Sequence, residues 1–274
     1  MSDEFKAFES AGWADRAETY DDLMGAVTAR LAEPLLDAAA VGAGTRLLDA
    51  ACGPGTTVAA AAARGAEPVG LDLAEGMVAE ARSRHPELRF QQGDVERLAF
   101  EDGRFDAVTA GFLLHHLPDP ARGVAELARV LAPGGRLAAT VWDDPERMRL
   151  IGLADDALER AGADRSAGVP DGPAAFGFAQ PEELTALLRG AGFGDVAART
   201  IAFTHRAESA EALWHGLLGG TVRTAEQVRN QPAPVRDRVR AAFTELAEAY
   251  RATDGAIEIP VAAVLACGRL AILR

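Results

Sequence analysis

The most constraining feature of this 274-residue chain is the alternation of two kinds of segment between residues 46 and 142. Short apolar runs, typical of buried strands, alternate with Ala-rich or amphipathic stretches, typical of helices. Because helices connect most of these strands, the strands are expected to run parallel with right-handed crossovers. The sequence predicts an α/β fold with a doubly wound sheet, with strands at 46–50, 68–71, 88–90, 105–110 and 136–142 and helices at 56–64, 76–85 and 120–131.

The pattern beyond residue 142 is less regular. Two strands, at 197–205 and 256–267, are expected at the sheet edge and bring the mostly parallel sheet to seven strands. Helices are expected at about 145–160, 181–192, 207–218 and 235–251. We interpret the chain as a single domain, 1–274, with a core at 46–142 and a helical cap formed by 1–40, 143–180 and 207–252.

Charge and composition narrow the class of partner. The chain has 28 Lys and Arg residues against 41 Asp and Glu, a net charge of −13. Nucleic acid and anionic membranes attract clustered positive charge, so neither is expected as a partner. Cys52 and Cys267 indicate neither a disulfide framework nor a metal site. Without a visible leader or an apolar run of spanning length, we expect a cytoplasmic protein with no membrane insertion, as a monomer or homodimer.

The strongest local signal is the run LLDAACGPGT at 47–56, where a predicted strand enters a glycine turn and then a helix. Gly53 and Gly55 allow the backbone to approach a ligand closely, and the free N–H groups of the helix can receive a polar group. Asp72 follows at the end of the next strand, where a carboxylate can accept hydrogen bonds from ribose hydroxyls. The sequence therefore predicts a nucleotide-like ligand, although each residue alone is also compatible with an ordinary turn.

Two differences from known nucleotide-binding motifs narrow the choice of ligand. A dinucleotide fingerprint requires a third glycine where this chain has Val58, and no Gly-Lys-Ser/Thr sequence follows as in a nucleoside triphosphate loop. The third strand is followed instead by Gly93-Asp94-Val95, where a carboxylate and a backbone N–H can bind an adenine edge. An isolated Asp94 is also compatible with a turn cap.

The ordered set of Asp49, the glycine turn, Asp72, Gly93-Asp94 and the Pro-Gly-Gly at 133–135 resembles the class I S-adenosylmethionine-dependent methyltransferases. It is similar in particular to the small-molecule branch of ubiquinone and menaquinone biosynthesis, including the Leu-His-His-Leu-Pro-Asp run at 114–119. The usual glycine before the loop cysteine is Ala51 here.

The resemblance implies a Rossmann-like methyltransferase sheet and S-adenosyl-L-methionine as the cofactor. The glycine loop would hold its methionine part, Asp72 the ribose, and Asp94 with Val95 the adenine. The resemblance thus assigns cofactor binding to these positions: Tyr20, Asp49, Gly53, Gly55, Asp72, Leu73, Asp94, Val95 and Phe112.

An apolar stripe precedes the core. Its members recur at steps of three and four residues, which predicts one continuous helical face that packs on the sheet. The members are Trp13, Ala17, Tyr20, Met24, Val27 and Leu31. In similar enzymes such a helix closes over the cofactor, so Tyr20 is expected near the methionine carboxylate and Trp13 in the acceptor pocket.

His115 and His116 follow the fourth strand, at the mouth where doubly wound sheets bind ligands. Histidine titrates near neutrality, so His115 is our candidate for the base that takes a proton from the acceptor, and His116 for an acceptor contact. Methyl transfer depends largely on orientation, so a dedicated base is not obligatory. Trp214, with His205 and His215, is a further candidate for the acceptor pocket, although a Trp at helical spacing is also typical of a core.

We therefore expect methyl transfer from S-adenosylmethionine to O, N or C of a small, partly apolar molecule, such as a secondary or quinone-like metabolite. One alternative is an enzyme that binds the same cofactor without methylating, such as a cyclase. Another is a non-catalytic cofactor-binding module, which a lost cofactor motif would favour, and none is lost. An NAD-dependent oxidoreductase is disfavoured by Val58.

Overall fold

The computed structural model describes residues 2–271, and its centre is a seven-stranded sheet in the order β3-β2-β1-β4-β5-β7-β6. The first five strands in this order are parallel, whereas β7 runs antiparallel to both β5 and β6. The predicted doubly wound, mostly parallel fold is confirmed. The strands are β1 (Arg46–Ala50), β2 (Glu67–Asp72), β3 (Arg89–Gln92), β4 (Phe105–Gly111), β5 (Leu131–Trp142), β6 (Phe193–Ala207) and β7 (Ile257–Leu270).

The two predicted edge strands occupy different places. β6 forms the edge, but β7 lies between β5 and β6 and is paired on both sides. The prediction that both lie at the edge is therefore wrong for the 256–267 strand. Its residues are buried along most of its length, as expected of an interior strand, while β6 alternates between exposed and half-buried positions.

Helices cover both faces of the sheet because neighbouring strand residues point to opposite sides. Leu48 and Val108 pack with α6 and α8 on one face, and Leu47 and Ala107 pack with α3 and α4 on the other. Cys52 is buried among apolar side chains of α4 and α5, in a packing role. These flanking helices are α3 (Ala32–Ala38), α4 (Thr56–Ala63), α5 (Glu75–Arg84), α6 (Pro120–Val130) and α8 (Pro181–Gly190).

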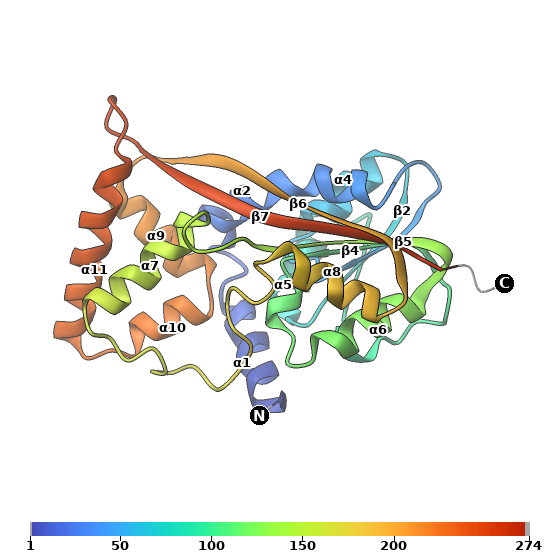
Figure 1. Ribbon diagram of the computed structural model, residues 1–274, viewed down its shortest axis with the longest axis horizontal. Helices are drawn as coiled ribbons and strands as arrows, with labels where there is room; N and C mark the ends of the chain where they lie inside the picture. Colours follow the sequence, from blue (N-terminus) through green and yellow to red (C-terminus); the bar gives the residue numbers. More distant parts are fainter. Residues whose placement is uncertain (1, 272–274) are drawn as a thin grey trace.

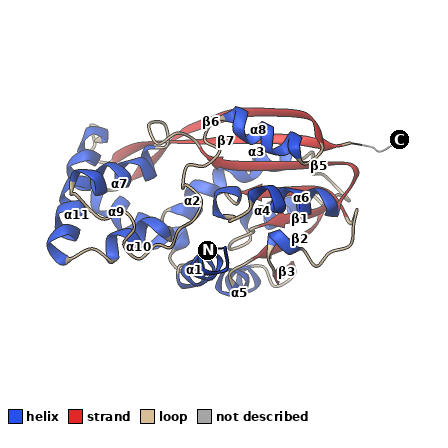
Figure 2. Cartoon of the chain, turned by 60° about the horizontal axis from the view of Figure 1, so that its bottom comes forward, coloured by secondary structure: helices blue, strands red, loops and turns tan. Residues whose placement is uncertain are grey.

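A helical cap stands at one end of the sheet, where β6 and β7 extend beyond the other strands (Figure 1). Figure 2 shows its helices gathered beside the sheet. Leu153, Leu213, Trp214 and Phe243 form its core together with Ile259 of β7. The cap helices are α7 (Arg149–Arg160), α9 (Ala210–Gly220), α10 (Arg223–Arg229) and α11 (Ala233–Ala247).

Helix α10 is absent from the sequence-based prediction. It spans a single seven-residue segment, RTAEQVR, with too few apolar residues to give a periodic signal. Helix α3, in contrast, was expected in the cap as part of residues 1–40 but packs on the sheet. No helix among residues 2–271 is long and apolar enough to cross a membrane.

The N-terminal stripe does not form the continuous helix that its spacing predicts. The chain forms α1 (Ser2–Asp15), a 3₁₀ turn at Tyr20–Asp22, α2 (Met24–Thr28) and a second 3₁₀ turn at Ala29–Leu31. Trp13 and Ala17 pack beside Met77 of α5, whereas Met24 and Val27 are buried in the cap. One straight helix cannot reach both partners, so the segment bends between them.

Candidate functional site

One cavity lies where the carboxyl ends of β1, β2, β4 and β5 face the cap, the expected ligand position in a doubly wound sheet. It encloses about 1240 Å³ of empty space, counting its open mouth. Its walls come from three parts of the chain: the core, the cap and the N-terminal segment.

The glycine loop between β1 and α4 forms one end of the cavity. Ala51, Gly53 and Gly55 all have positive φ, at 62°, 51° and 93°. A Cβ at Gly55 would lie 2.9 Å from the ring of Phe90, so this position excludes a side chain. A Cβ at Gly53, which lines the cavity, would meet nothing within 4 Å. The loop therefore presents bare backbone to a ligand at Gly53, while Gly55 shapes the turn behind it.

Asp72 lies beside this loop at the end of β2. Its Oδ2 accepts a hydrogen bond from the N–H of Gly53 at 2.9 Å, and its Oδ1 accepts one from the N–H of Ala74 at 2.9 Å. Burial raises the pKa of Asp72, although these two hydrogen bonds oppose the shift. A carboxylate offers about four lone-pair positions, so Asp72 can still accept hydrogen bonds from a ligand.

Asp49 is the one predicted cofactor residue besides Gly55 that does not line the cavity. It is buried under the loop, where its Oδ1 accepts a hydrogen bond from the hydroxyl of Thr109 at 2.7 Å. Burial raises the pKa of Asp49 to about 7 against that hydrogen bond, and the charge of Asp72 adds to the rise. Asp49 therefore lies behind the glycine loop, away from the cavity, where it can support the loop.

The loop after β3 lines the same end of the cavity through Asp94 and Val95. Asp94 Oδ1 accepts a hydrogen bond from the N–H of Glu96 at 2.9 Å, which fixes its orientation. Its Oδ2 accepts one from Lys6 Nζ at 2.8 Å, and Lys6 also lies 2.6 Å from Glu96. Lys6 comes from α1, so the N-terminal helix is attached to the loop.

Aromatic side chains line the cavity toward the cap. Phe112, at the end of β4, stacks on Trp142 with ring centroids 3.8 Å apart. Phe112 has a φ of 54°, rare for a bulky residue, and its N–H donates to the carbonyl of Thr140 at 2.9 Å. Trp13 and Tyr20 meet edge to face at 6.0 Å. The remaining apolar lining includes Met24, Met77, Ile151 and Phe176.

The hydroxyl of Tyr20 faces a defined partner, Thr28. The two hydroxyl oxygens lie 3.1 Å apart, and burial raises the pKa of Tyr20 to about 12. Tyr20 therefore stays protonated and neutral in the neutral pH range. It lines the cavity, as does Leu73 at the glycine-loop end.

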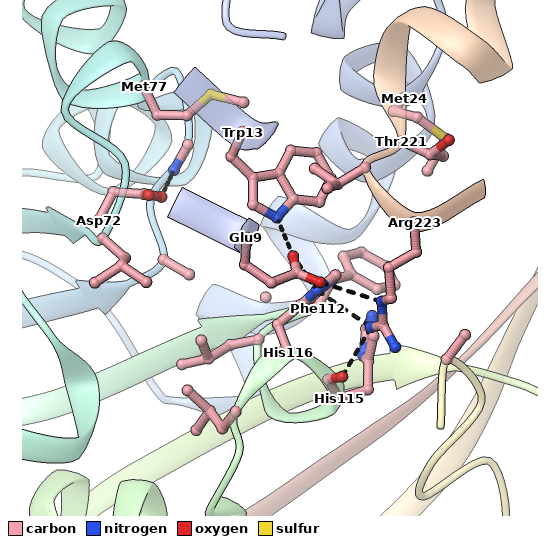
Figure 3. A pocket seen from close by; sticks show the side chains of 18 of the residues that line it. Glu9, Trp13, Met24, Asp72, Met77, Phe112, His115, His116, Thr221 and Arg223 are labelled. Atoms are coloured by element: carbon pink, nitrogen blue, oxygen red, sulfur yellow. Dashed lines mark hydrogen bonds and ion pairs between the residues drawn. The ribbon is translucent and has the colours of Figure 1, made fainter. Parts of the chain in front are cut away.

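Four polar or aromatic residues, Glu9, Trp13, His116 and Arg223, form the Glu9 cluster (Figure 3). The cluster lines the cavity between its glycine-loop end and its aromatic end. Glu9 is 2% exposed. Its Oε2 accepts hydrogen bonds from Trp13 Nε1 at 2.8 Å and from His116 Nδ1 at 2.9 Å. Its Oε1 lies 3.2 Å from Arg223 Nε. Burial alone would raise the pKa of Glu9, but these charged and hydrogen-bonding neighbours together lower it, so Glu9 is ionised.

His115 lies next to this cluster and is 2% exposed. Its Nδ1 is buried without a hydrogen-bond partner among the described residues. Burial, with the charges of His116 and Arg223, holds the pKa of His115 well below its usual range. His115 lines the cavity as a neutral imidazole, although its unpaired Nδ1 is itself buried.

The remaining predicted acceptor residues lie elsewhere. Trp214 is buried in the cap core against Phe243, at a centroid distance of 5.0 Å, and does not line the cavity. His215 is exposed and pairs with Glu211, and His205 lies on the edge strand β6. The spacing of apolar residues in α9 could not show whether Trp214 faces the cap core or the cavity.

The lining residues that no sequence motif indicates include Lys6, Glu9, Trp142 and Arg223. Lys6 and Glu9 reach the cavity on α1 and Arg223 on α10, all far from the glycine loop in sequence, whereas Trp142 ends β5. Lys6 is the chain's single lysine, the one sequence feature that could have drawn attention to it. Within residues 2–271, no three His, Cys, Asp or Glu side chains gather as metal ligands do.

Comparison with known proteins agrees with this geometry. Residues 48–139 match the family described as "Methyltransferase domain". The chain is 36% identical over 174 residues to a demethylmenaquinone methyltransferase from Beutenbergia cavernae, covering 61% of this chain and 72% of the relative. A demethylmenaquinone methyltransferase from Clavibacter sepedonicus is 33% identical over 192 residues, covering 66% of this chain and 76% of the relative.

Solved structures give the same fold. The YcgJ protein from Bacillus subtilis superimposes with a TM-score of 0.56 at 22% identity, covering 88% of this chain and 98% of that protein. The fold, the cavity and the relatives together define a class of enzyme that transfers methyl groups. The chain belongs to the class I S-adenosylmethionine-dependent methyltransferases, resembling those of menaquinone biosynthesis, and its cofactor is S-adenosylmethionine.

Proposed function

We propose that this methyltransferase acts on a small, partly apolar molecule, at O, N or C, held between the core and the cap. The observation that carries the proposal is the single cavity that joins the glycine-loop end, with Gly53 and Asp72, to an aromatic end with Phe112 and Trp142. A macromolecular acceptor needs an open surface, whereas this aromatic end is roofed by cap helices and by α1.

The glycine-loop end fits the cofactor. The backbone at Gly53 is open toward the cavity, and the polar methionine part would lie there beside the N–H groups at the start of α4. Asp72 would accept the ribose hydroxyls, and Asp94 with Val95 would hold the adenine. Asp49 and Gly55 support the loop without contact. Leu73, Tyr20 and Phe112 would complete the walls.

The aromatic end fits a planar acceptor. Phe112 and Trp142 present stacked rings, and Ile151 and Phe176 add apolar surface from the cap. The relatives named for methylating demethylmenaquinone favour a quinone-like or phenolic ring among such molecules. Trp13, from α1, would border this ring.

When bound, S-adenosylmethionine supplies an electrophilic methyl carbon, to which the acceptor bonds as the carbon–sulfur bond breaks and its electron pair leaves with sulfur. The protein aligns the acceptor and excludes water, which accounts for much of the acceleration of such a displacement. The lowered pKa of His115 makes it a weak base, so we assign it the narrower role of hydrogen-bonding the acceptor's nucleophilic group.

The proposal is tested by incubating the protein with methyl-labelled S-adenosylmethionine and a bacterial cell extract. We expect label in the low-molecular-mass apolar fraction, together with cofactor binding by calorimetry. Label confined to protein or nucleic acid would contradict a small-molecule acceptor. Cofactor binding with no labelled product in any fraction would instead favour a cyclase-like enzyme or a binding module.

A further inference from the structure

The Glu9 cluster places a buried carboxylate against a cavity-lining imidazole. Glu9 comes from α1, near the N-terminus, and His116 from the turn after β4, 107 residues later. Burying an ionised carboxylate is costly unless charge and hydrogen bonds compensate it. The α1 helix therefore carries Glu9 into the cavity wall at a cost that simple packing of the helix would not require.

The contact with Glu9 favours one position for the proton of the His116 imidazole. Glu9 is ionised, so at 2.9 Å its Oε2 can only accept, and a hydrogen bond between the two requires the hydrogen on Nδ1 of His116. Arg223 Nη2 lies 3.3 Å from the same nitrogen, and because a guanidinium can only donate, this longer contact opposes a hydrogen on Nδ1 while the shorter contact with Glu9 favours it. In the neutral imidazole with hydrogen on Nδ1, Nε2 of His116 has a free lone pair, and no described residue forms a hydrogen bond to it.

His116 differs from His115 in the partners of its imidazole ring. The His115 ring has no carboxylate partner, and it lies 4.3 Å from the His116 ring between centroids. The charged groups that face His116 are Glu9 from α1, Arg223 from α10 and Asp72 from β2. Two of these three are anionic and oppose the single guanidinium. His116, unlike His115, therefore has a carboxylate hydrogen-bonded to its ring.

We propose that Glu9 and His116 form a carboxylate–imidazole pair that removes the proton from an O–H or N–H methyl acceptor. The inference rests on the proposed function. As the acceptor's lone pair bonds to the methyl carbon and the carbon–sulfur electron pair leaves with sulfur, the acceptor's proton moves to Nε2 of His116. Glu9 stabilises the resulting imidazolium, which returns its proton to water after the product leaves. His116 is the catalytic residue and Glu9 a positioning residue.

The pair also depends on the position of α1. This helix is bound to the core through Lys6 and Asp94, and Arg16, which directly follows the helix, binds Glu226 of α10 in the cap, at 2.8 Å in both cases. With α1 displaced, His116 would lose Glu9. The position of α1 therefore determines whether His116 has its carboxylate partner.

The first test needs no acceptor. Nitrogen-detected NMR of the imidazoles in the full-length protein identifies which nitrogen of His116 carries hydrogen. We expect Nδ1–H in the wild type, and a mixture of tautomers in Glu9→Gln because an amide can donate as well as accept. The matched control is Glu245→Gln, which weakens an exposed ion pair with Arg160 within the cap and leaves the contacts of α1 unchanged. An Nε2–H tautomer in the wild type would overturn the pair.

The second test measures transfer of labelled methyl groups to a panel of small phenols and aromatic amines. We expect His116→Asn to lower kcat about a hundredfold or more, the usual contribution of a general base. Glu9→Gln should lower kcat less and move the acidic limb of the pH–rate profile to lower pH. His115→Asn should leave that limb in place. The pair is rejected as a base if the limb follows His115, or if no phenol or amine gains label.

Calorimetry with S-adenosylmethionine separates this inference from the proposed function. Cofactor affinity should stay within about threefold of the wild type in Glu9→Gln and His116→Asn, since neither carries a proposed cofactor contact. A wild-type protein that fails to bind the cofactor would contradict the proposed function itself. Intact cofactor binding with an unchanged pH–rate profile in Glu9→Gln would contradict only the role of the Glu9–His116 pair as a base.

Discussion

Lys6 Nζ lies 2.8 Å from Asp94 Oδ2, so the only lysine of the chain reaches from α1 to the carboxylate expected to hold adenine. The same ammonium lies 2.6 Å from Glu96, whose side chain is buried. One short helix is thereby attached directly to the cofactor end of the cavity. Because Glu9 lies one helical turn further along, the same helix also sets the wall facing the acceptor.

We expect Lys6→Met to speed the dissociation of S-adenosylmethionine about fivefold, as loss of a partly exposed ion pair worth about 1 kcal/mol implies. Stopped-flow displacement of the bound cofactor measures this rate. Arg240→Met removes an exposed ion pair with Glu211 in the cap and serves as the control. An unchanged or slower dissociation in Lys6→Met would show that α1 is not retained over the cofactor through this contact.

Two glycines of the loop should respond differently to alanine. Gly55→Ala adds a methyl group 2.9 Å from Phe90 at a φ of 93°, so we expect a loss of about 2 kcal/mol of folding stability. Gly53→Ala meets no protein atom within 4 Å, so its stability loss should be smaller while cofactor affinity falls about tenfold. Urea unfolding and calorimetry measure the two effects. Wild-type cofactor affinity in Gly53→Ala would place the ligand elsewhere.

Tyr20→Phe tests whether the N-terminal segment contacts the cofactor. Removing the hydroxyl should weaken S-adenosylmethionine binding by about fivefold, the usual value of one neutral hydrogen bond. Thr28→Val removes the partner of that hydroxyl, 3.1 Å away, and keeps the hydroxyl itself, so it should bind the cofactor more tightly than Tyr20→Phe does. Equal affinities for Tyr20→Phe and the wild type, measured by calorimetry, would remove Tyr20 from the cofactor site.

Asp49 makes folding stability depend on pH. Its pKa is about 7 in the folded protein and near 3.8 when unfolded, so the folded state binds the extra proton. The stabilisation is complete below pH 4 and is lost as pH rises toward 7, a change of a few kcal/mol. Asp49→Asn should remove this loss while keeping an oxygen for Thr109.

Urea unfolding between pH 4 and 8 compares wild type, Asp49→Asn and the exposed control Asp237→Asn. The difference in unfolding free energy between Asp49→Asn and the wild type should grow with pH and level off above about pH 7. A difference that is constant across this range would mean that Asp49 is ionised throughout and that its burial is compensated.

Local patterns were enough to predict the residues that meet at the glycine-loop end of the cavity. Strand, glycine turn and helix follow one another within 47–56, and Asp72 ends the next strand, so contacts close in sequence carry most of the geometry. The doubly wound order then brings Asp94 to the same edge of the sheet. The predicted core fold is confirmed for the same reason.

The acceptor end depends on contacts that no periodicity encodes. Arg223 begins a polar helix of seven residues, and its guanidinium donates to the carbonyls of Pro173 and His115 at 2.7 and 2.9 Å. The prediction failed in the other direction for Trp214, which was expected in the acceptor pocket but lies in the cap core. The apolar stripe at 13–31 predicted one continuous helix, which is wrong because the two halves of the stripe pack against different partners.

The most direct measurement uses S-adenosylmethionine with a trideuterated methyl group, the wild-type protein and a fractionated bacterial metabolite extract, followed by mass spectrometry. We predict a small aromatic product that carries one trideuteromethyl group, and a lower yield of that product from Gly53→Ala at a limiting concentration of cofactor. If the protein binds the cofactor but no small molecule gains the group in any fraction, the cavity is not a methyl-transfer site for small molecules.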